Sequence, residues 1–374
     1  MTPKLDHIDT PALLLDARKL EHNCRRMRSI VHGHGVALRP HVKTAKSVEV
    51  AQVALDAPAG AITVSTLREA EYFFDHGFRD ILYAVGMAPG KLRRVVDLIK
   101  RGAHVSAIVD SVEAATALAR AVASSGVRIP TLIEIDSDGH RAGVQPEDAR
   151  LFAIADALGG SLQGVMTHAG DSYNCDGPEG IRGVAERERA AVVRAAARLR
   201  EKGQACEVVS VGSTPTATFA ESLEGVTEVR TGVYMFQDLV MAGLGVCAVD
   251  DIAVSVLATV IGHQQEKGWI ITDAGWMALS RDRGTARQKV DQGYGVVCDV
   301  AGQPIEGLIV SDANQEHGII ARRDGGPADL ARFPIGSRLR VLPNHACATA
   351  AQHGEYNVLR EGQPVEVWER FGGW

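Results

Sequence analysis

The chain has 374 residues, of which 45% are hydrophobic and 23% are charged, a balance typical of a folded globular protein and not of a disordered one. Its 40 lysines and arginines stand against 46 aspartates and glutamates, which gives a net charge of -6 with no long run of one sign. This charge argues against a nucleic-acid or anionic membrane partner and favours a small-molecule one.

The longest apolar stretches, such as residues 253–261, are shorter than the roughly twenty residues that span a bilayer. The first residues also lack the basic and then apolar pattern of a signal peptide, so we expect a cytoplasmic protein. The six cysteines are scattered without a C-x-x-C pair. This spacing argues against a disulfide framework or a structural zinc site and favours cysteines that act singly.

The first element is a short apolar strand. Residues 11–16 read Pro-Ala-Leu-Leu-Leu-Asp and precede a helix predicted over 19–31. The strand is surplus to the repeating pattern that follows it. We therefore expect it to pair with a second domain.

From residue 36 to about residue 240, short β-branched segments alternate with longer amphipathic ones. This alternation predicts repeated βα units and a parallel sheet. Eight such units are what a closed (β/α)8 TIM-type barrel requires, so we expect an α/β fold of this kind. The predicted strands are 36–39, 61–65, 81–85, 104–110, 131–136, 163–168, 207–211 and 226–230.

The helices between these strands are predicted from apolar residues at three- and four-residue spacing. They include residues 67–76, 91–100, 112–124 and 182–201. Two helix starts have the pattern of a capping box or a close relative, in which a polar side chain accepts from a backbone N–H and a glutamate reaches back. These two are Thr66–Glu69 and Asp110–Glu113.

After about residue 245 the pattern becomes strand-like, with turn residues between the segments and no long helical periodicity. We expect a barrel domain over 18–245 and a β-rich domain over 246–374. The N-terminal strand, within residues 1–17, is expected to be part of the β-rich domain. The predicted strands of the β-rich domain are 252–261, 269–273, 294–299, 304–311, 338–343 and 365–370.

Active sites of TIM-type barrels lie at the carboxyl ends of the strands, so the residues after each strand are the candidates. The first strand is followed by Arg39-Pro-His-Val-Lys-Thr-Ala-Lys46. If this segment is extended, His41 and Lys43 point the same way. Neighbouring positive charge and partial burial favour a neutral Lys43 amine, which is able to attack an aldehyde. The alternative is an exposed basic turn.

The seventh and eighth strands end in residues suited to an anion. Gly212-Ser213-Thr214-Pro215 offers N–H groups and hydroxyls at a helix start, and Gly232 after Arg230-Thr231 allows close backbone approach. Barrels of this type often bind phosphate with these two loops. The alternative is an ordinary helix cap followed by a glycine turn.

The fifth and sixth strands end near Arg141 and His168. Arg141 could donate to a phenolate or carboxylate, and His168 could position a ring or a substrate group. A histidine at a strand end is more often a hydrogen-bonded core residue, but the shared face of the two strands favours the functional interpretation.

In the β-rich part, His345 and Cys347 follow a strand and would project to the same side of an extended chain. Imidazole nitrogen and thiolate sulfur suit zinc, and two protein ligands would leave positions for water and substrate. The alternative is a structural role. Further polar or aromatic candidates are Trp276, Arg281, Arg283 and residues 314–318.

Together these motifs resemble those of fold-type III pyridoxal phosphate enzymes of the D-threonine aldolase and D-serine dehydratase family, whose barrel is of the alanine racemase type. The similarity covers essentially the whole chain. His-x-Cys, in place of the His-x-Asp of the aldolases, favours the dehydratase branch. The segments that carry the resemblance are 39–47, 134–144, 209–216, 273–289, 313–319 and 342–349.

The resemblance implies roles for individual residues. Lys43 would form the internal aldimine with pyridoxal 5'-phosphate, and Arg141 would lie near the cofactor's 3-hydroxyl. Arg230 matches a position where racemases of this fold hold the pyridine nitrogen. His345 and Cys347 would bind a divalent metal, with zinc, manganese, magnesium and cobalt all open. The remaining expected cofactor contacts are His168, Tyr173, Ser213, Thr214, Gly232 and Val233.

The activity implied is the dehydration of a D-3-hydroxy amino acid, with D-threo-3-hydroxyaspartate the expected substrate, to a 2-oxo acid and ammonia. Lys43 would remove the α-proton and the metal would assist loss of the β-hydroxyl. A second carboxylate would meet Arg281 or Arg283. The alternatives are a D-serine dehydratase, a D-threonine or 3-hydroxyaspartate aldolase, a racemase, and a pyridoxal phosphate carrier without turnover. The resemblance also implies a homodimer.

Overall fold

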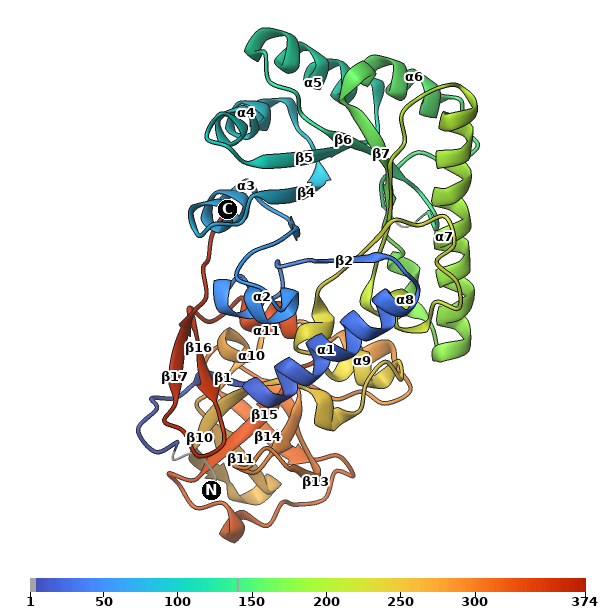
Figure 1. Ribbon diagram of the computed structural model, residues 1–374. Helices are drawn as coiled ribbons and strands as arrows, with labels where there is room; N and C mark the ends of the chain where they lie inside the picture. The colour runs from blue at the N-terminus through green and yellow to red at the C-terminus, as the bar shows by residue number, and fades with distance from the viewer. Residues whose placement is uncertain (1–4, 140) are drawn as a thin grey trace. The chain divides into compact units, whose positions relative to one another are not determined.

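The computed structural model describes residues 5–139 and 141–374, and they fall into two compact units (Figure 1). One unit runs from Arg25 to Gly232 and includes the last two residues. The other combines the residues up to Cys24 with Val233–Gly372. Helix α1 (Ala17–Gly33) contributes residues to both units. The first unit holds an all-parallel sheet, and the second holds a mainly antiparallel one.

The first unit is a (β/α)8 barrel. Its parallel strands are hydrogen-bonded in the order β2-β9-β8-β7-β6-β5-β4-β3, and a parallel bridge between His41 and Thr63 joins the two ends of the sheet. The eight strands predicted for this region are confirmed in the part of the chain that the structure describes. They are β2 Ala37–Pro40, β3 Ile62–Val64, β4 Asp80–Gly86, β5 His104–Val109, β6 Thr131–Ile135, β7 Leu162–Thr167, β8 Val208–Val211 and β9 Glu228–Thr231.

Helices cover the outside of this sheet; in Figure 1, α4 to α7 lie on the outer side of β5 to β7. The helices of the first unit are α2 Val48–Leu55, α3 Leu67–Asp75, α4 Leu92–Lys100, α5 Val112–Ser125, α6 Arg150–Leu158, α7 Pro178–Glu201 and α8 Thr214–Phe219. None of the helices in the described residues is long and apolar enough to cross a membrane.

Side-chain caps fix where two of these helices begin. The Thr66 hydroxyl accepts from the Glu69 N–H at 3.0 Å, and the Glu69 carboxylate accepts from the N–H of Ser65, one residue earlier than a strict capping box requires. The second predicted cap is wrong by one residue. Ser111, and not Asp110, caps α5 by accepting from the Ala114 N–H. Both side chains suit this role, and sequence alone did not separate them.

The barrel interior is filled by side chains from successive strands. Leu82, Ile108, Leu132 and Met166 form one buried cluster and come from β4, β5, β6 and β7. Gly164 of β7 has no room for a side chain, because a Cβ there would lie 1.9 Å from the Val208 carbonyl oxygen on β8. Close packing of these two strands therefore depends on glycine.

The second unit is β-rich, as predicted. Its strands lie in the order β11-β14-β13-β12-β15-β10-β1-β16-β17, and β11 also pairs with β10, so that six of them form a closed antiparallel ring. They are β1 Ala12–Asp16, β10 Val254–Gln264, β11 Trp269–Thr272, β12 Val296–Cys298, β13 Pro304–Ala313, β14 Gly318–Arg322, β15 Arg338–Leu342, β16 Glu355–Leu359 and β17 Glu366–Glu369. Short helices in this unit are α9 Leu239–Gly243, α10 Trp276–Leu279 and α11 Ala346–Ala350.

Two of these strands, β14 and β16, were not predicted. Both are five residues long and follow segments of mixed polar character, so local alternation gave little signal. The expected pairing of the N-terminal strand with the second domain is confirmed. Strand β1 lies between β10, to which it is antiparallel, and β16, to which it is parallel.

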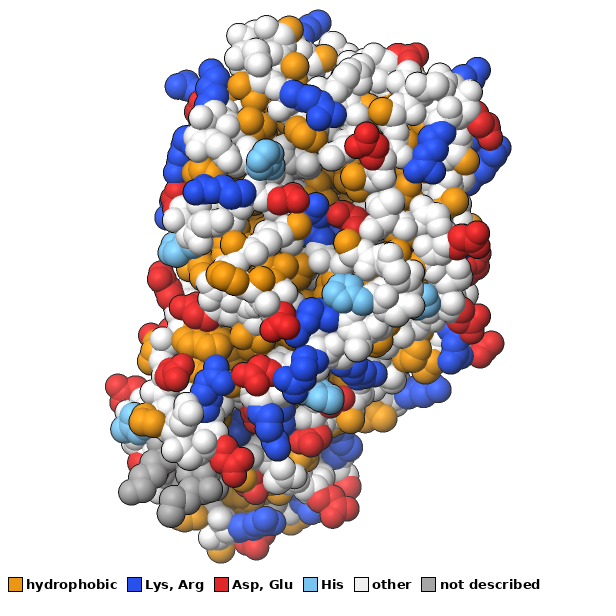
Figure 2. All heavy atoms as spheres, in the orientation of Figure 1, with side chains coloured by type: hydrophobic (Ala, Val, Ile, Leu, Met, Phe, Trp, Pro, Cys, Tyr) orange, Lys and Arg blue, Asp and Glu red, His pale blue; other side chains and the backbone are white. Residues whose placement is uncertain are grey.

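Positive and negative side chains are interspersed over the face of the molecule that Figure 2 shows, rather than gathered in one basic area. This distribution fits the small net charge of -6.

Gly164→Ala should destabilise the protein, because the added methyl group meets a backbone oxygen that cannot move without disturbing β8. We expect a loss of at least about 2 kcal/mol in the free energy of unfolding, measured from urea denaturation curves. Gly160→Ala is the matched control, because a Cβ at Gly160 has nothing within 4 Å. Equal stability of the two variants would contradict the proposed strand packing.

Candidate active site

Lys43 lies in the turn after β2, at the carboxyl end of the barrel. The expectation that this segment is extended is wrong, because the chain turns at Val42, whose carbonyl accepts from the Lys46 N–H at 2.8 Å. The expected partial burial of Lys43 is also wrong, since its side chain is exposed. The turn separates His41 from Lys43, so the two side chains do not share one face of a strand.

His41 is drawn into the end of the barrel by the bridge between β2 and β3. Its Nδ1 is buried and has no hydrogen-bond partner among the described residues. Burial lowers the pKa of His41 well below 6.5, and the charges of Lys43 and Arg230 lower it further. A neutral imidazole with an unused ring nitrogen therefore lies beside Lys43.

His168 follows β7 and faces the same group of cations. Its Nδ1 lies 2.7 Å from the Gly212 carbonyl oxygen, which can only accept, so Nδ1 carries the proton and Nε2 is left as an acceptor. Burial lowers the pKa of His168 to about 4, and the charges of Lys43, Arg141 and Arg230 act in the same direction. Three predicted site residues, Lys43, Arg141 and Arg230, thus lie close enough to the His168 imidazole to affect its pKa.

Arg141 is more than half exposed and lies near the end of β6. Its Nη2 is 3.5 Å from the Glu134 carboxylate, a partner that the sequence did not reveal. Burial raises the pKa of Glu134, whereas the Arg141 charge lowers it. A small cavity brings Arg141 and His168 together, and its other lining residues are Glu134, Ile135, Asp136, Ser137, Asp138 and Ala142.

Tyr173 lies in the loop after β7, with its ring centroid 6.5 Å from that of His168. The ring is 37% exposed, so it lies at the surface of this end of the barrel. Tyr173 is therefore near the predicted cofactor residues.

The turn after β8 begins helix α8 with a full capping box. The Ser213 hydroxyl accepts from the Thr216 N–H, and the Thr216 hydroxyl accepts from the Ser213 N–H at 3.3 Å. The Thr214 hydroxyl contacts that of Thr231 at the end of β9. The helix-cap alternative is thus correct for Ser213, and the phosphate role of this turn stays a prediction.

Two glycines allow the strand ends to approach one another closely. A Cβ on Gly212 would lie 1.7 Å from the Arg230 carbonyl oxygen, and one on Gly232 would lie 2.6 Å from that of His41. Val233 follows directly and is 7% exposed. Gly212 and Gly232 therefore have no room for a side chain, and only glycine allows this packing of the strand ends.

Arg230 is buried, and backbone and hydroxyl oxygens hold its guanidinium. Nη2 donates to the Thr167 carbonyl at 2.5 Å, and Nη1 donates to the Ser210 hydroxyl at 2.7 Å. Burial lowers the pKa of Arg230, and the carboxylates of Glu228 and Glu188 oppose this effect. Arg230 is thus a fixed donor group beneath the site.

In the second unit, His345 and Cys347 lie together, although the expected extended geometry is wrong. His345 is the N-terminal cap residue of α11, and Cys347 lies in its first turn. Burial lowers the pKa of His345, but the charge of Cys347 and a hydrogen bond to Asp282 outweigh it and raise that pKa to about 11. The helix start, and not strand alternation, brings the nitrogen and sulfur side by side.

Asp282 is a candidate site residue that the sequence analysis did not single out. Its Oδ2 lies 2.6 Å from His345 Nδ1, which leaves Nε2 on the other side of the ring. Asp238 fixes the adjacent backbone, since its buried carboxylate accepts from the Ala346 N–H at 2.9 Å. A carboxylate on the second nitrogen of a histidine is the usual support of a metal-binding imidazole.

The loop before Asp282 has a local turn that a side chain holds. Ser280 has a positive φ of 74°, which is rare outside glycine, and its hydroxyl accepts from the Asp282 N–H at 2.9 Å. Arg283 Nη2 lies 2.6 Å from the Asp291 carboxylate. The Arg281 guanidinium is 4.5 Å from the Trp276 ring centroid, and no ion pair of Arg281 occurs among the described residues.

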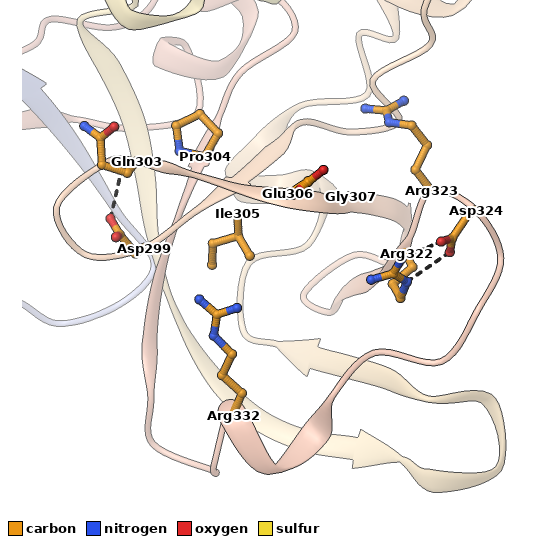
Figure 3. Close-up of a pocket in the computed structure, with 10 residues that line it drawn as sticks. All are labelled: Asp299, Gln303, Pro304, Ile305, Glu306, Gly307, Arg322, Arg323, Asp324 and Arg332. Atoms are coloured by element: carbon orange, nitrogen blue, oxygen red, sulfur yellow. Dashed lines mark hydrogen bonds and ion pairs between the residues drawn. The ribbon is translucent and has the colours of Figure 1, made fainter.

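Residues 314–317 form the turn between β13 and β14, and Gly318 begins β14. The Asn314 and Gln315 carbonyls accept from the Trp276 and Met277 N–H groups, so this turn packs against the start of α10. A cavity of about 800 Å³ in this unit contains none of the predicted site residues (Figure 3). It is lined by Asp299, Gln303, Pro304, Ile305, Glu306, Gly307, Arg322, Arg323, Asp324 and Arg332.

Comparison with known proteins places both units in one enzyme family. Residues 15–239 match the N-terminal domain of alanine racemase, and residues 253–359 match a serine dehydratase domain. The chain belongs to the alanine racemase-like family of pyridoxal phosphate enzymes, in the branch with a serine dehydratase domain.

Individual relatives are similar over nearly their full lengths. The D-threo-3-hydroxyaspartate dehydratase of Delftia sp. strain HT23 is 56% identical over 98% of both chains, and its solved structure superposes with a TM-score of 0.97 over 99% of each. The D-threonine aldolase of an Arthrobacter species is 30% identical over 98% of this chain and 93% of its own. A cysteine-to-alanine variant of a D-threo-3-hydroxyaspartate dehydratase that is 56% identical to this chain has been solved in the metal-free form.

The low pKa of His168 predicts a pH dependence of stability. Between about pH 6.5 and pH 4 the unfolded chain binds a proton at this residue and the folded chain does not, so stability should fall as the pH falls. From pH 7 to pH 5 we expect a loss of about 1 to 2 kcal/mol from His168. His168→Asn keeps an N–H for Gly212 and should reduce the loss measured by urea denaturation. Exposed His34→Asn is the control, and an equal loss in both variants would contradict the assignment.

Proposed function

We propose that this protein is a pyridoxal phosphate- and metal-dependent dehydratase that converts D-threo-3-hydroxyaspartate to oxaloacetate and ammonia. The observation that carries the proposal is the 56% identity, over 98% of both chains, to an enzyme of that name. The D-serine dehydratase of Dictyostelium discoideum and the D-threonine aldolase, at 29% and 30% identity, are more distant.

The barrel end fits pyridoxal phosphate in its donor chemistry. Gly232 lets the strand ends pack closely, since a Cβ there would also come within 2.9 Å of the Thr44 hydroxyl. Around this point lie hydroxyls, N–H groups and cations, which suit a phosphate and a phenolate oxygen. An exposed amine, Lys43, is at the same end of the barrel.

The proposed assignment follows the sequence prediction. Lys43 would bind the cofactor covalently, Arg141 would donate to its 3-hydroxyl oxygen, and Arg230 would face its ring nitrogen. The phosphate is held by Ser213, Thr214, Gly232 and Val233, and the ring is bordered by His168 and Tyr173.

When bound, pyridoxal phosphate supplies a conjugated ring that accepts the electron pair left on Cα after loss of a proton. Lys43 Nζ would take this proton, because Lys43 is the exposed amine in the turn after β2 that is assigned to the cofactor. His41 and His168, both neutral, add no positive charge beside this amine.

His345 and Cys347 fit a divalent metal, and their nitrogen and sulfur favour zinc. Within the described residues no cluster of three or more histidine, cysteine or carboxylate ligands exists, so these two side chains would leave positions for water and a substrate hydroxyl. Asp282 holds His345 Nδ1 and leaves Nε2 for the metal. Such a metal supplies Lewis-acid assistance to a departing hydroxide.

The overall reaction balances without an oxidant. The α-proton and the β-hydroxyl leave as water, and the resulting enamine takes up water to give oxaloacetate and ammonia. The residues of this chain bind the substrate, move the α-proton and hold the β-hydroxyl in place.

Arg281 is the proposed partner of the substrate's second carboxylate. Arg283, the other candidate, already pairs with Asp291. Arg281 adjoins Asp282, the carboxylate that holds His345, and it stacks on Trp276. It therefore offers its outer N–H groups to an anion beside the proposed metal.

The test of the function is a product assay. Metal-replete enzyme is incubated with D-threo-3-hydroxyaspartate, D-serine and D-threonine, while 2-oxo acid, ammonia and glycine are followed with and without chelator. We expect oxaloacetate and ammonia from the first substrate, in a chelator-sensitive reaction. Lys43→Ala should lose both this activity and the absorbance of covalently bound cofactor.

Other products would change the assignment. Glycine with an aldehyde would indicate an aldolase, and pyruvate from D-serine as the main product would indicate a D-serine dehydratase. Full activity after complete removal of metal would contradict the role of His345 and Cys347.

Arg281→Ala should raise KM for D-threo-3-hydroxyaspartate by about 10- to 100-fold, the equivalent of one charge-assisted hydrogen-bond pair. KM for D-serine, which lacks the second carboxylate, should change little. Steady-state kinetics with both substrates measure this difference. Arg287→Ala, an exposed change in the same loop, is the control. An equal loss with both substrates would show that Arg281 does not bind the second carboxylate.

A further inference from the structure

Glu188 places a carboxyl group on the buried side of helix α7. It is 2% exposed, and the residues one turn before and after it, Val184 and Val192, are also buried. A carboxyl group on such an apolar stripe is costly to bury unless its oxygens are hydrogen-bonded. Its contacts therefore show what it holds in place.

One oxygen of Glu188 ties the ends of two neighbouring strands to α7. Oε1 accepts from the Gly212 N–H at 2.9 Å and from the Ala169 N–H at 3.2 Å. Ala169 follows β7, and Gly212 follows β8. Two of the loops that carry predicted cofactor residues thus share a single acceptor atom.

The contacts of Glu188 continue into the turn after β8. The Thr216 hydroxyl hydrogen-bonds the Glu188 carboxyl, and it also lies 2.9 Å from the Ser213 hydroxyl. At Gly212 the backbone is held from both sides, since its carbonyl accepts from His168 Nδ1 at 2.7 Å. A substitution of Glu188 would therefore alter the position of Ser213.

The hydrogen bonds of Glu188 offset part of the cost of burying its carboxyl group. Burial raises the pKa of Glu188, although the N–H of Gly212 and the Thr216 hydroxyl oppose that effect. A neutral amide of the same size can accept from both N–H groups, so glutamine is a conservative replacement.

We propose that Glu188 is the positioning residue of the turn 212–216 that binds the cofactor's phosphate, and that it acts by fixing the Gly212 amide and the Thr216 hydroxyl. It does so without being a catalytic residue, because its effect passes through Ser213 and Thr214. The inference rests on the proposed use of pyridoxal phosphate by this protein.

The test compares two cofactor forms. Pyridoxal 5'-phosphate and pyridoxal share the ring and the aldehyde and differ in the phosphate, so their dissociation constants separate the phosphate turn from the rest of the site. In Glu188→Ala the two N–H groups lose a buried acceptor. We expect the dissociation constant of pyridoxal 5'-phosphate to rise at least about ten-fold and that of pyridoxal to change less than about two-fold. Absorbance titration of the cofactor-depleted protein gives both constants.

Three further variants make the result interpretable. Glu188→Gln should restore most of the affinity because it keeps the acceptor. Thr216→Val removes the hydroxyl and should raise the dissociation constant of pyridoxal 5'-phosphate relative to that of pyridoxal, as Glu188→Ala does. It replaces Glu188→Ala in the test if that variant does not fold. Glu186→Gln is the matched control on α7, since Glu186 is exposed and pairs with Arg189.

The outcomes separate the inference from the proposed function. An equal loss for both cofactor forms, or no loss for either, would overturn the role of Glu188. Failure of the unmodified protein to bind pyridoxal 5'-phosphate would instead overturn the proposed function.

Discussion

Closure of the parallel sheet is the constraint on which the barrel end depends. Strand β2 pairs with β9 on one side and is bridged to β3 at His41 and Thr63 on the other, so the first and last strands of the barrel become neighbours. Because all the strands run in one direction, closure gathers their carboxyl ends into a single ring. Gly232 is part of this constraint, since a side chain there would collide with the His41 carbonyl.

Much of the fold could be predicted from the sequence because its signals are local. Most of the barrel strands are buried segments rich in β-branched residues between amphipathic helices, and neighbours in the chain are neighbours in the sheet. The second unit gave a weaker signal. The burial pattern of β14 depends on β11 and β13 on either side of it, and five residues carry too little alternation to reveal that pairing.

The candidate site was predicted through its residue types more than through its geometry. His345 and Cys347 lie together, but at the start of a helix, and Lys43 occupies a turn where an extended chain was expected. The supporting carboxylates could not be predicted, because their partners are distant in the chain: Asp282 is 63 residues from His345, and Glu188 is 24 residues from Gly212. For Glu188 the one local signal is its place between Val184 and Val192 on the apolar side of a helix, which indicates a buried carboxyl group but not its partners.

The place of β1 in its sheet affects how the chain is made. Leu13, Leu14 and Leu15 are at most 1% exposed, yet the strands that cover them end at Gln264 and Leu359. During synthesis the barrel segment is complete long before β16 leaves the ribosome. The apolar strand β1 therefore lacks at least one of its two partner strands for almost the whole of translation. Unpaired strand edges of this kind bind chaperones and promote aggregation.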